Sequence, residues 1–143
     1  PLHPDWEFLA LVPDFPLNTN YARSVLPTEV PRASAVYNIA HGALVLKALE
    51  LGDEKLLRTA MQDKLHQPFR KRLIADYDAI EALVRTTGAA FCLSGAGPTL
   101  LCITQDAKLE EKLAKKLNTI TKAAWQMLPL HVEFQGAHVL ECE

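Results

Sequence analysis

A glycine-rich turn is the part of this sequence best placed to do chemistry. It reads Ser94-Gly95-Ala96-Gly97-Pro98-Thr99 and lies between two apolar runs, 89–93 and 99–104. Its two unhindered glycines can adopt positive φ angles and leave backbone N–H groups uncovered by side chains. Such a loop can hold a phosphate or a carboxylate. It lacks the lysine of a Walker A loop and the third glycine of a dinucleotide fingerprint, so a plain tight connection between two strands is the alternative interpretation.

Two arginines stand beside breaks in the helical pattern. Arg23 follows 19–22 (TNYA), and Arg70 follows 66–69 (HQPF). A guanidinium group is a planar fork that can grip a carboxylate through two parallel hydrogen bonds. Both arginines are therefore candidates for binding an acidic substrate group, although a plain surface position is the commoner situation for arginine.

The histidines and carboxylates give weaker indications. His41 lies within an apolar stretch, where it either completes the core or lines a pocket, and His66 precedes Pro68. The five histidines form no HxxxH or HExxH pattern, so we expect no metal site. No pair of carboxylates and no nucleophile elbow stands out, and we therefore expect no catalytic residue in this chain.

Strands and helices must position these residues, and the spacing of apolar residues changes along the chain between the period of a strand and that of a helix. We predict strands over 6–12, 89–93 and 99–104, followed by two short strands or one bulged strand at 131–134 and 137–140. Helices are predicted over 19–26, 31–51, 53–65, 71–87 and 106–121. Helices grouped apart from a few strands indicate an α+β fold, with a small antiparallel sheet backed by helices.

The helix boundaries rest on individual residues. Thr19 is the predicted N-cap of the first helix and Asp53 that of the third, while Gly52 ends the long second helix. Pro68 predicts a bend over 66–69. The long helix carries apolar residues at three-and-four spacing, which predicts a wide apolar face: Val36, Ile39, Ala40, Ala43, Leu44 and Leu46.

Composition excludes several classes of protein. The 143 residues are 49% hydrophobic and 22% charged, which is enough apolar material for one packed domain. A formal net charge of −2 gives no electrostatic reason to bind nucleic acid or an anionic membrane. Three cysteines without a CxxC motif argue against a disulfide framework and favour a reducing compartment.

Taken together, four segments resemble the C-terminal domain of the homoserine kinases, which belong to the GHMP family of small-molecule kinases. They are 17–27 (LNTNYARSVLP), 37–42 (YNIAHG), 63–70 (DKLHQPFR) and 93–99 (LSGAGPT). The glycine segment resembles the third motif that many GHMP kinases share, whereas the arginine segments point to homoserine. The family's N-terminal phosphate-binding loop is absent from the sequence, and Phe69 stands where tyrosine is frequent.

The resemblance implies a fold and a reaction. The chain would be a single ferredoxin-like domain over residues 1–143, with a sheet of about four antiparallel strands. The full cytoplasmic enzyme would transfer the γ-phosphate of ATP to the hydroxyl of L-homoserine, giving O-phospho-L-homoserine in threonine biosynthesis. ATP and Mg²⁺ would be bound mainly by an N-terminal half that is absent here. The fragment alone is therefore expected to bind no cofactor and to be inactive.

The resemblance also implies roles for particular residues. Arg23 and Arg70 would clamp the substrate carboxylate, and His41 would line the same pocket. The expected partners are L-homoserine and the protein's own N-terminal domain, with a homo-oligomer also compatible. A loop near the transferred phosphate would be formed by Ser94, Gly95, Ala96, Gly97 and Thr99.

Two other interpretations stay open at this point. The chain could be the C-terminal domain of another GHMP kinase, such as a mevalonate-type enzyme. It could instead be a ferredoxin-like regulatory module that binds an amino acid without chemistry, because a fold does not fix a function.

Overall fold

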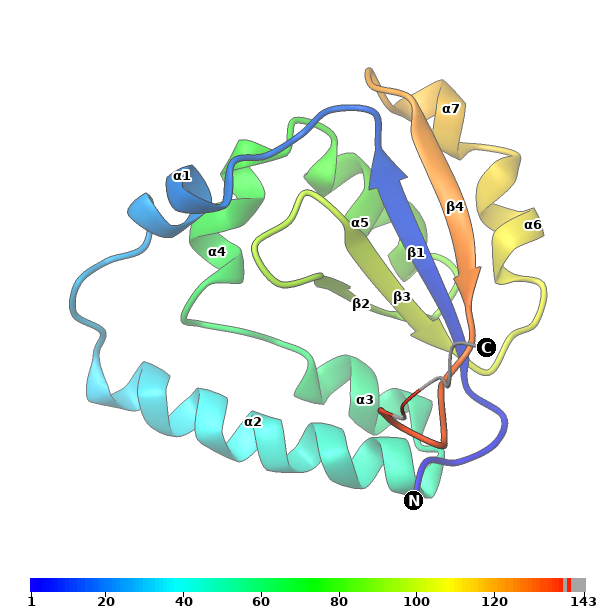
Figure 1. Cartoon of the computed structure of the whole chain (residues 1–143), viewed down its shortest axis with the longest axis horizontal. Helices are drawn as coiled ribbons and strands as arrows, with labels where there is room; N and C mark the ends of the chain where they lie inside the picture. Colours follow the sequence, from blue (N-terminus) through cyan, green and yellow to red (C-terminus); the bar gives the residue numbers. More distant parts are fainter. Residues whose placement is uncertain (138, 140–143) are drawn as a thin grey trace.

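One antiparallel sheet flanked by helices organises the chain, as the computed structural model in Figure 1 shows. The structure describes residues 1–137 and 139. The elements follow the chain in this order: β1 (Glu7–Pro13), α1 (Thr19–Ser24), α2 (Arg32–Leu51), α3 (Glu54–Ala60), α4 (Gln67–Arg70), the 3₁₀ turn η1 (Lys71–Leu73), α5 (Tyr77–Arg85), β2 (Ala90–Leu93), β3 (Leu100–Thr104), α6 (Leu109–Ala114), α7 (Leu117–Ile120) and β4 (Trp125–Leu130).

The four strands are arranged in the order β2-β3-β1-β4, and every neighbouring pair is antiparallel. β2 and β3 form a hairpin in which Leu93 lies opposite Leu100, so the glycine turn connects these two residues. β1 lies inside the sheet, where Leu9 is paired with Cys102. The predicted α+β class with a small antiparallel sheet is confirmed.

The two faces of the sheet are covered differently. Side chains alternate along β1, so Leu9 and Leu11 belong to a large core that includes buried residues of α5, α6 and α7. Phe8 belongs to a smaller core with Leu57 of α3 and Ala48 near the end of α2. One face is therefore fully packed, while the other is covered mainly at one end.

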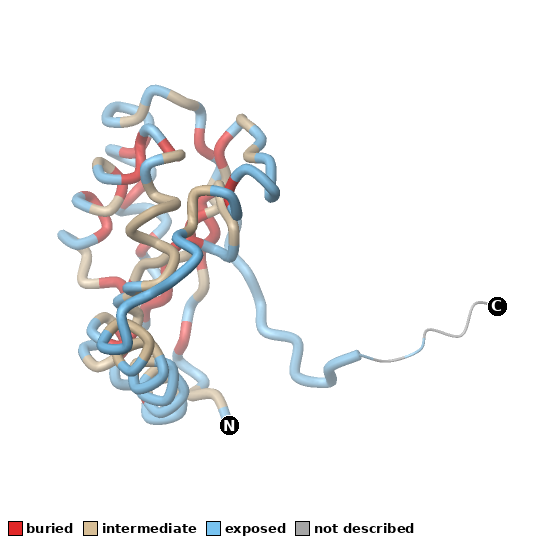
Figure 2. The backbone as a smooth tube through the Cα atoms, turned by 90° about the vertical axis from the view of Figure 1, so that its left-hand side faces the viewer, coloured by how far each residue is buried: buried red, intermediate tan, exposed pale blue. Residues whose placement is uncertain are grey.

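Figure 2 shows the consequence for burial. Buried positions concentrate in the sheet and in the helices packed on it, whereas most of α2 is exposed and the segment after β4 projects from the body. Among the described residues, no helix combines the length and the apolar character that crossing a bilayer requires.

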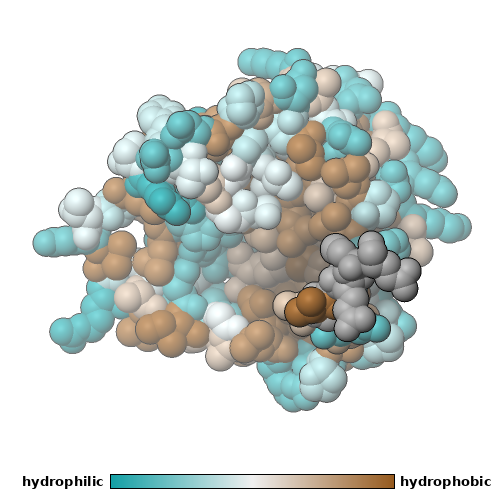
Figure 3. All heavy atoms as spheres, viewed as in Figure 1, coloured by the Kyte–Doolittle hydropathy of each residue, from teal (hydrophilic) through white to brown (hydrophobic). Residues whose placement is uncertain are grey.

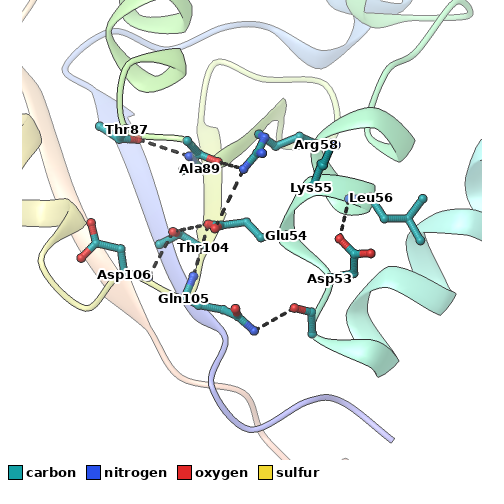
Figure 4. Close-up of polar contacts among 12 residues, drawn as sticks. Asp53, Glu54, Lys55, Leu56, Arg58, Thr87, Ala89, Thr104, Gln105 and Asp106 are labelled. Carbon is teal, nitrogen blue, oxygen red and sulfur yellow. Dashed lines mark hydrogen bonds and ion pairs between the residues drawn. The ribbon is translucent and has the colours of Figure 1, made fainter.

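Polar contacts fasten α3 to one end of the sheet, as Figure 4 shows. The hydroxyl of Thr104 donates to the carboxylate of Glu54, and the backbone N–H of Gln105 donates to the same oxygen at 3.4 Å. Arg58 donates to the carbonyl of Gly88, just before β2. These contacts join α3 to residues at least thirty positions later in the chain and hold it against β2 and β3.

The last strand differs from the prediction. β4 covers Trp125–Leu130, and the described residues 131–134 form no strand. The predicted segment 137–140 includes residues 138 and 140, which lie outside the described residues. β4 contains Pro129 and is an edge strand, which is where a sheet tolerates a proline because the missing N–H leaves no ladder hydrogen bond unmade.

Several helices are shorter than predicted. The helix predicted over 53–65 ends at Ala60, and the one predicted over 71–87 divides into η1 and α5. The helix predicted over 106–121 divides into α6 and α7. The apolar spacing continues from α6 to α7 because both helices bury residues in the same core. η1 itself buries no residue, and Ile74, which follows it, joins that core together with α5.

Local caps explain two further differences. Asn18, not Thr19, caps α1, because its side-chain oxygen accepts a hydrogen bond from the backbone N–H of Tyr21 at 3.0 Å. The bend predicted over 66–69 is the short helix α4, with Pro68 in its first turn, where its missing N–H leaves no helical bond unmade.

The apolar face predicted for the long helix does not pack on the core. Val36, Ile39 and Leu46 are 60%, 76% and 71% exposed, and Ala48 is the buried residue of α2. The predicted spacing is present, but α2 is apolar on both sides, and the core packs against the side that carries Ala48 and Val45.

Candidate functional site

The glycine turn between β2 and β3 is closed by its own backbone. The N–H of Ser94 donates to the carbonyl of Thr99 at 2.9 Å, and the N–H of Gly97 donates to the carbonyl of Ser94 at 3.1 Å. Gly95 and Gly97 adopt φ angles of 60° and 85°, as their type predicts. In the part of the chain that the structure describes, the N–H groups of Gly95 and Ala96 make no hydrogen bond. Two donors are therefore available to a ligand.

Replacing Gly97 with alanine should destabilise the turn. A Cβ there would lie 2.9 Å from Leu93 Cδ1, and the positive φ angle is strained for any residue with a Cβ. We expect a loss of about 2 kcal/mol in the free energy of unfolding, measured by urea denaturation. Gly42→Ala is the matched control, because Gly42 lies in α2 with nothing within 4 Å of its would-be Cβ, and it should be neutral or stabilising. Equal destabilisation by both variants would contradict this account.

Arg70 joins the turn to α1. Its Nε donates to the carbonyl of Ala22 at 3.0 Å, and its Nη1 donates to the carbonyl of Gly95 at 3.1 Å. A guanidinium carries five N–H groups, so these two bonds leave three for a ligand. Arg70 is half-buried, and its fork is held in one orientation by two segments that lie far apart in the sequence.

Arg23 lies next to this junction. It directly follows Ala22, whose carbonyl accepts from Arg70, and its own side chain is exposed. No ion pair or side-chain hydrogen bond involves Arg23 among the described residues. The segments carrying Arg23, Arg70 and Gly95 are thus brought together at one end of the sheet, and the Arg23 side chain is the least constrained of the group.

His41 lies in a neighbouring hollow. Its ring stacks on Tyr37 with centroids 3.6 Å apart, and its Nδ1 lies 2.8 Å from the Tyr37 carbonyl. The hollow has a volume of ≈ 250 Å³ and is also lined by Asn38, Gln67 and Leu93, among others. His41 therefore shares a wall with α4 and with the start of the glycine turn, and among the described residues no hydrogen bond joins it to Arg23 or Arg70.

Asp63 is a positioning residue that the sequence pattern did not single out. Its side chain is 7% exposed, and its Oδ2 accepts from the backbone N–H groups of His66 and Gln67 at 2.7 and 2.6 Å. Its Oδ1 accepts from the side chain of Asn38 on α2 at 2.5 Å. Asp63 therefore caps the N-terminus of α4, the helix that carries Arg70. An aspartate three residues before a predicted turn with proline was the available signal.

The electrostatics of Asp63 follow from these contacts. Burial alone raises the pKa of its carboxyl, but the hydrogen bonds from His66, Asn38 and Gln67 outweigh burial and hold the pKa below its ordinary value. The carboxylate is therefore charged near neutral pH, as a cap facing two N–H groups requires.

Gln67 completes the connection between α4 and the turn. Its side-chain oxygen accepts from the backbone N–H of Leu93 at 2.7 Å, and its side-chain nitrogen donates to the carbonyl of Met61 at 3.3 Å. Leu93 is the last residue of β2 before the turn. One short helix thus fixes both the guanidinium of Arg70 and the strand end from which the glycine turn departs.

Residues 45–122 match the family described as GHMP kinases C terminal. The chain therefore belongs to this family of small-molecule kinases, and the sheet and glycine turn described above are those of its C-terminal domain.

Similarity to proteins of known name is more specific than the match to the family. The chain is 47% identical to a homoserine kinase of Nostoc punctiforme over 127 residues, covering 88% of this chain and 40% of that protein. It is 41% identical to a homoserine kinase of Crocosphaera subtropica over 142 residues, covering 97% of this chain and 46% of that protein. The chain thus spans less than half the length of these relatives.

Solved structures share the fold. A homoserine kinase from Cytophaga hutchinsonii superposes with a TM-score of 0.83 at 22% identity, covering 92% of this chain and 43% of that chain. A phosphomevalonate kinase from Streptococcus pneumoniae superposes with a TM-score of 0.66 at 12% identity, covering 87% of this chain and 40% of that one. At these identities the likeness concerns the fold alone.

Proposed function

We propose that this chain is the C-terminal, substrate-binding half of a homoserine kinase. In the proposed reaction the side-chain hydroxyl of L-homoserine attacks the γ-phosphorus of ATP, ADP departs, and the hydroxyl proton is lost, giving O-phospho-L-homoserine. The observation that carries the proposal is the 41% identity to a homoserine kinase over 97% of this chain.

The arrangement of the arginines supports homoserine as the substrate. Homoserine presents a carboxylate, and the fork of Arg70 is already oriented by Ala22 and Gly95. Arg23 adds a second positive charge next to Ala22, so the pair would grip the carboxylate from two segments. His41 would line the same pocket from α2. Phosphoryl transfer depends mainly on positioning and charge neutralisation, so a fixed carboxylate contributes to rate as well as to affinity.

The glycine turn would lie near the transferred phosphoryl group. The N–H groups of Gly95 and Ala96 are unengaged, and backbone N–H groups of this kind can stabilise developing negative charge. The hydroxyls of Ser94 and Thr99 flank them, and Gly97 provides the tight turn. The turn alone does not enclose a nucleotide, so its proposed role is to complete a phosphate site built mainly elsewhere.

We assign the binding of ATP and Mg²⁺ to an N-terminal half, because the relatives are more than twice as long as the part that this chain covers. Among the described residues, no group of three or more His, Cys, Asp or Glu side chains is arranged to hold a metal ion.

Figure 3 shows a recessed apolar area over the open face of the sheet, where Leu128 and Leu130 of β4 are 37% and 44% exposed. The N-terminal half would cover this face, and the complete enzyme would act in the cytoplasm in threonine biosynthesis.

A coupled ADP-release assay tests the proposed function. A complete protein, in which this chain follows the N-terminal half of a homoserine kinase, should phosphorylate L-homoserine and not mevalonate. The 143-residue chain alone should be inactive. Preference for mevalonate would assign the chain to another GHMP kinase. ATP-independent binding of an amino acid without ADP release would favour a regulatory module.

Replacing Arg23 with alanine in that complete protein should raise the KM for homoserine. Loss of one charge-assisted contact costs about 1.5–3 kcal/mol, so we expect roughly a 10- to 150-fold increase, with the KM for ATP unchanged. Arg72→Ala is the matched control, because Arg72 is exposed in η1, two residues after Arg70. An unchanged KM in Arg23→Ala would remove Arg23 from the site.

A further inference from the structure

Asn38 joins α2 to the segment between α3 and α4, which runs alongside α2 in Figure 1. Its side-chain nitrogen donates to Asp63 Oδ1 at 2.5 Å, and its side-chain oxygen accepts from the backbone N–H of Lys64 at 2.9 Å. Both ends of the amide are therefore engaged, and a flipped amide could make neither bond, because the nitrogen only donates and the oxygen only accepts. Asn38 thus holds two successive residues of the segment to one point of α2.

Asp63 connects this point of α2 to α4. Its second oxygen, Oδ2, accepts from the backbone N–H groups of His66 and Gln67 at 2.7 and 2.6 Å, where α4 begins. α4 has only four residues, and a single helical turn is unstable without contacts to the rest of the protein. The direction of α4, and of Arg70 at its end, therefore depends on where Asp63 is held.

The proposed substrate contacts come from two separate elements, His41 from α2 and Arg70 from α4. Asn38 and His41 are neighbours on the surface of α2, because they lie three positions apart in a helix, and both line the same hollow. Among the described residues, the hydrogen bonds between α2 and residues 61–70 are the two that Asn38 makes. Asn38 is therefore well placed to set the spacing of the two substrate contacts.

We propose that Asn38 is a positioning residue of the substrate site, which fixes His41 relative to Arg70 through its hydrogen bond to Asp63. The inference rests on the proposed function, because it concerns the groups proposed to hold homoserine. The core contributes little to the position of this part of α2, since the buried residue of the helix, Ala48, lies near the other end. A substrate that is held from two elements binds well only while their spacing is maintained.

A ring contact beside Asn38 is the alternative source of this spacing. The ammonium group of Lys64 lies 3.9 Å from the centroid of the Tyr37 ring, and that ring stacks on His41. Lys64 is exposed, and exposed contacts of this kind are weak. Asn38 makes two directional hydrogen bonds, one of them to a carboxylate, so it restricts the segment more strictly.

Amide exchange in the 143-residue chain tests the role of Asn38 without reference to any reaction. The Nε–H of Arg70 donates to the carbonyl of Ala22 at 3.0 Å, so NMR should show it exchanging slowly with solvent. Asn38→Leu, which keeps the size of the side chain and removes both hydrogen bonds, should speed this exchange at least about ten-fold. Asn118→Leu is the matched control, because Asn118 is exposed on α7 and makes no side-chain hydrogen bond among the described residues. Unchanged exchange at Arg70 in Asn38→Leu would overturn the proposal.

Exchanging the two side chains gives a sharper test. Because Asp63 accepts from Asn38 on one oxygen and from two backbone N–H groups on the other, an amide at position 63 can keep its oxygen on those N–H groups and turn its nitrogen toward position 38. A carboxylate at position 38 then accepts from that nitrogen and from the N–H of Lys64. The double variant Asn38→Asp/Asp63→Asn therefore reverses one hydrogen bond and keeps the others. Asn38→Asp alone sets two carboxylates against each other, and Asp63→Asn alone sets two amide nitrogens together.

Steady-state kinetics of the complete protein measure the consequence for the substrate. Asn38→Asp and Asp63→Asn should each raise the KM for homoserine about ten-fold with the KM for ATP unchanged, and the double variant should recover most of the loss. A purely structural role would lower the folded fraction, and hence kcat, without changing either KM. Single variants with an unchanged KM, or a double variant as impaired as the worse single one, would contradict the proposal. If the unmodified protein does not phosphorylate homoserine, the proposed function fails, and the exchange at Arg70 still decides the role of Asn38.

Discussion

In the proposed homoserine kinase, Arg70→Ala should lower kcat/KM for homoserine roughly 30- to 150-fold. The estimate follows from the loss of one bidentate, charge-assisted contact, which costs on the order of 2–3 kcal/mol in transition-state binding. Arg70 differs from Arg23 because it also donates to the carbonyls of Ala22 and Gly95. Its removal therefore frees α1 from the glycine turn, so we expect kcat to fall together with the rise in KM. Steady-state kinetics with homoserine and ATP varied separately provide the measurement.

Two comparisons separate binding from structural support. Arg70→Lys keeps the positive charge but loses the planar fork, so it should recover only a small part of kcat/KM. Guanidinium ion added to the Arg70→Ala enzyme should restore activity in part if the missing group acts on the substrate. The assignment of Arg70 would be wrong if Arg70→Ala kept full activity, or if its whole effect were matched by a fall in folded fraction.

The second large effect should come from Asp76, a buried carboxylate that holds the chain before β4 to α5. Its side chain accepts from the backbone N–H groups of Lys122 and Ala123, both at 3.0 Å, and from the indole N–H of Trp125 at 3.1 Å. Asp76 is 3% exposed. Asp76→Ala leaves three donors without an acceptor, each worth about 1 kcal/mol or more. We expect a loss of about 3 kcal/mol in the free energy of unfolding, measured by urea denaturation of the 143-residue chain.

Asp78→Ala is the matched control for this variant. Asp78 lies two residues further along, is 82% exposed and pairs with Lys71 at the surface, so its loss should change stability by less than about 1 kcal/mol. Similar losses in the two variants would show that the three donors to Asp76 do not carry the effect.

Asp76 also predicts a pH dependence. Burial alone raises the pKa of its carboxyl, but the hydrogen bonds from Lys122, Ala123 and Trp125 outweigh burial and lower the pKa in the folded state. A carboxyl with a lowered folded pKa contributes stability above its unfolded pKa of about 3.9 and loses it as the pH falls through the folded value. The free energy of unfolding should therefore fall below about pH 4, and less steeply in Asp76→Asn. Equal slopes for both proteins would exclude Asp76 as the source.

The glycine turn shows how far local sequence reaches. Gly95 and Gly97 adopt the positive φ angles that their type permits, and the apolar runs on either side form β2 and β3. The roles of Arg70 in the turn could not be read from spacing, because its acceptors are 48 and 25 residues away. Spacing identified the arginine as a candidate, and only the folded chain shows what orients it.

β4 shows the opposite case. Its sequence, WQMLPL, carries a proline and no clear alternation, so local pattern placed the last strand after it. The strand forms because β1 offers an unpaired edge, with which Leu128 and Met127 pair opposite Ala10 and Leu11. An edge partner contributed by residues more than a hundred positions earlier leaves no local signal.

By itself, the sequence determined the α+β class, the hairpin around the glycine turn, the end of α2 at Gly52 and the residues that could grip a carboxylate. These features follow from φ/ψ preferences and from periodicity, which act between near neighbours in the chain. Only the tertiary structure decided which side of α2 packs on the core, that Asp63 caps α4, and that α4 holds Arg70 and the turn together. Those outcomes depend on contacts between distant segments, whose energies no local pattern records.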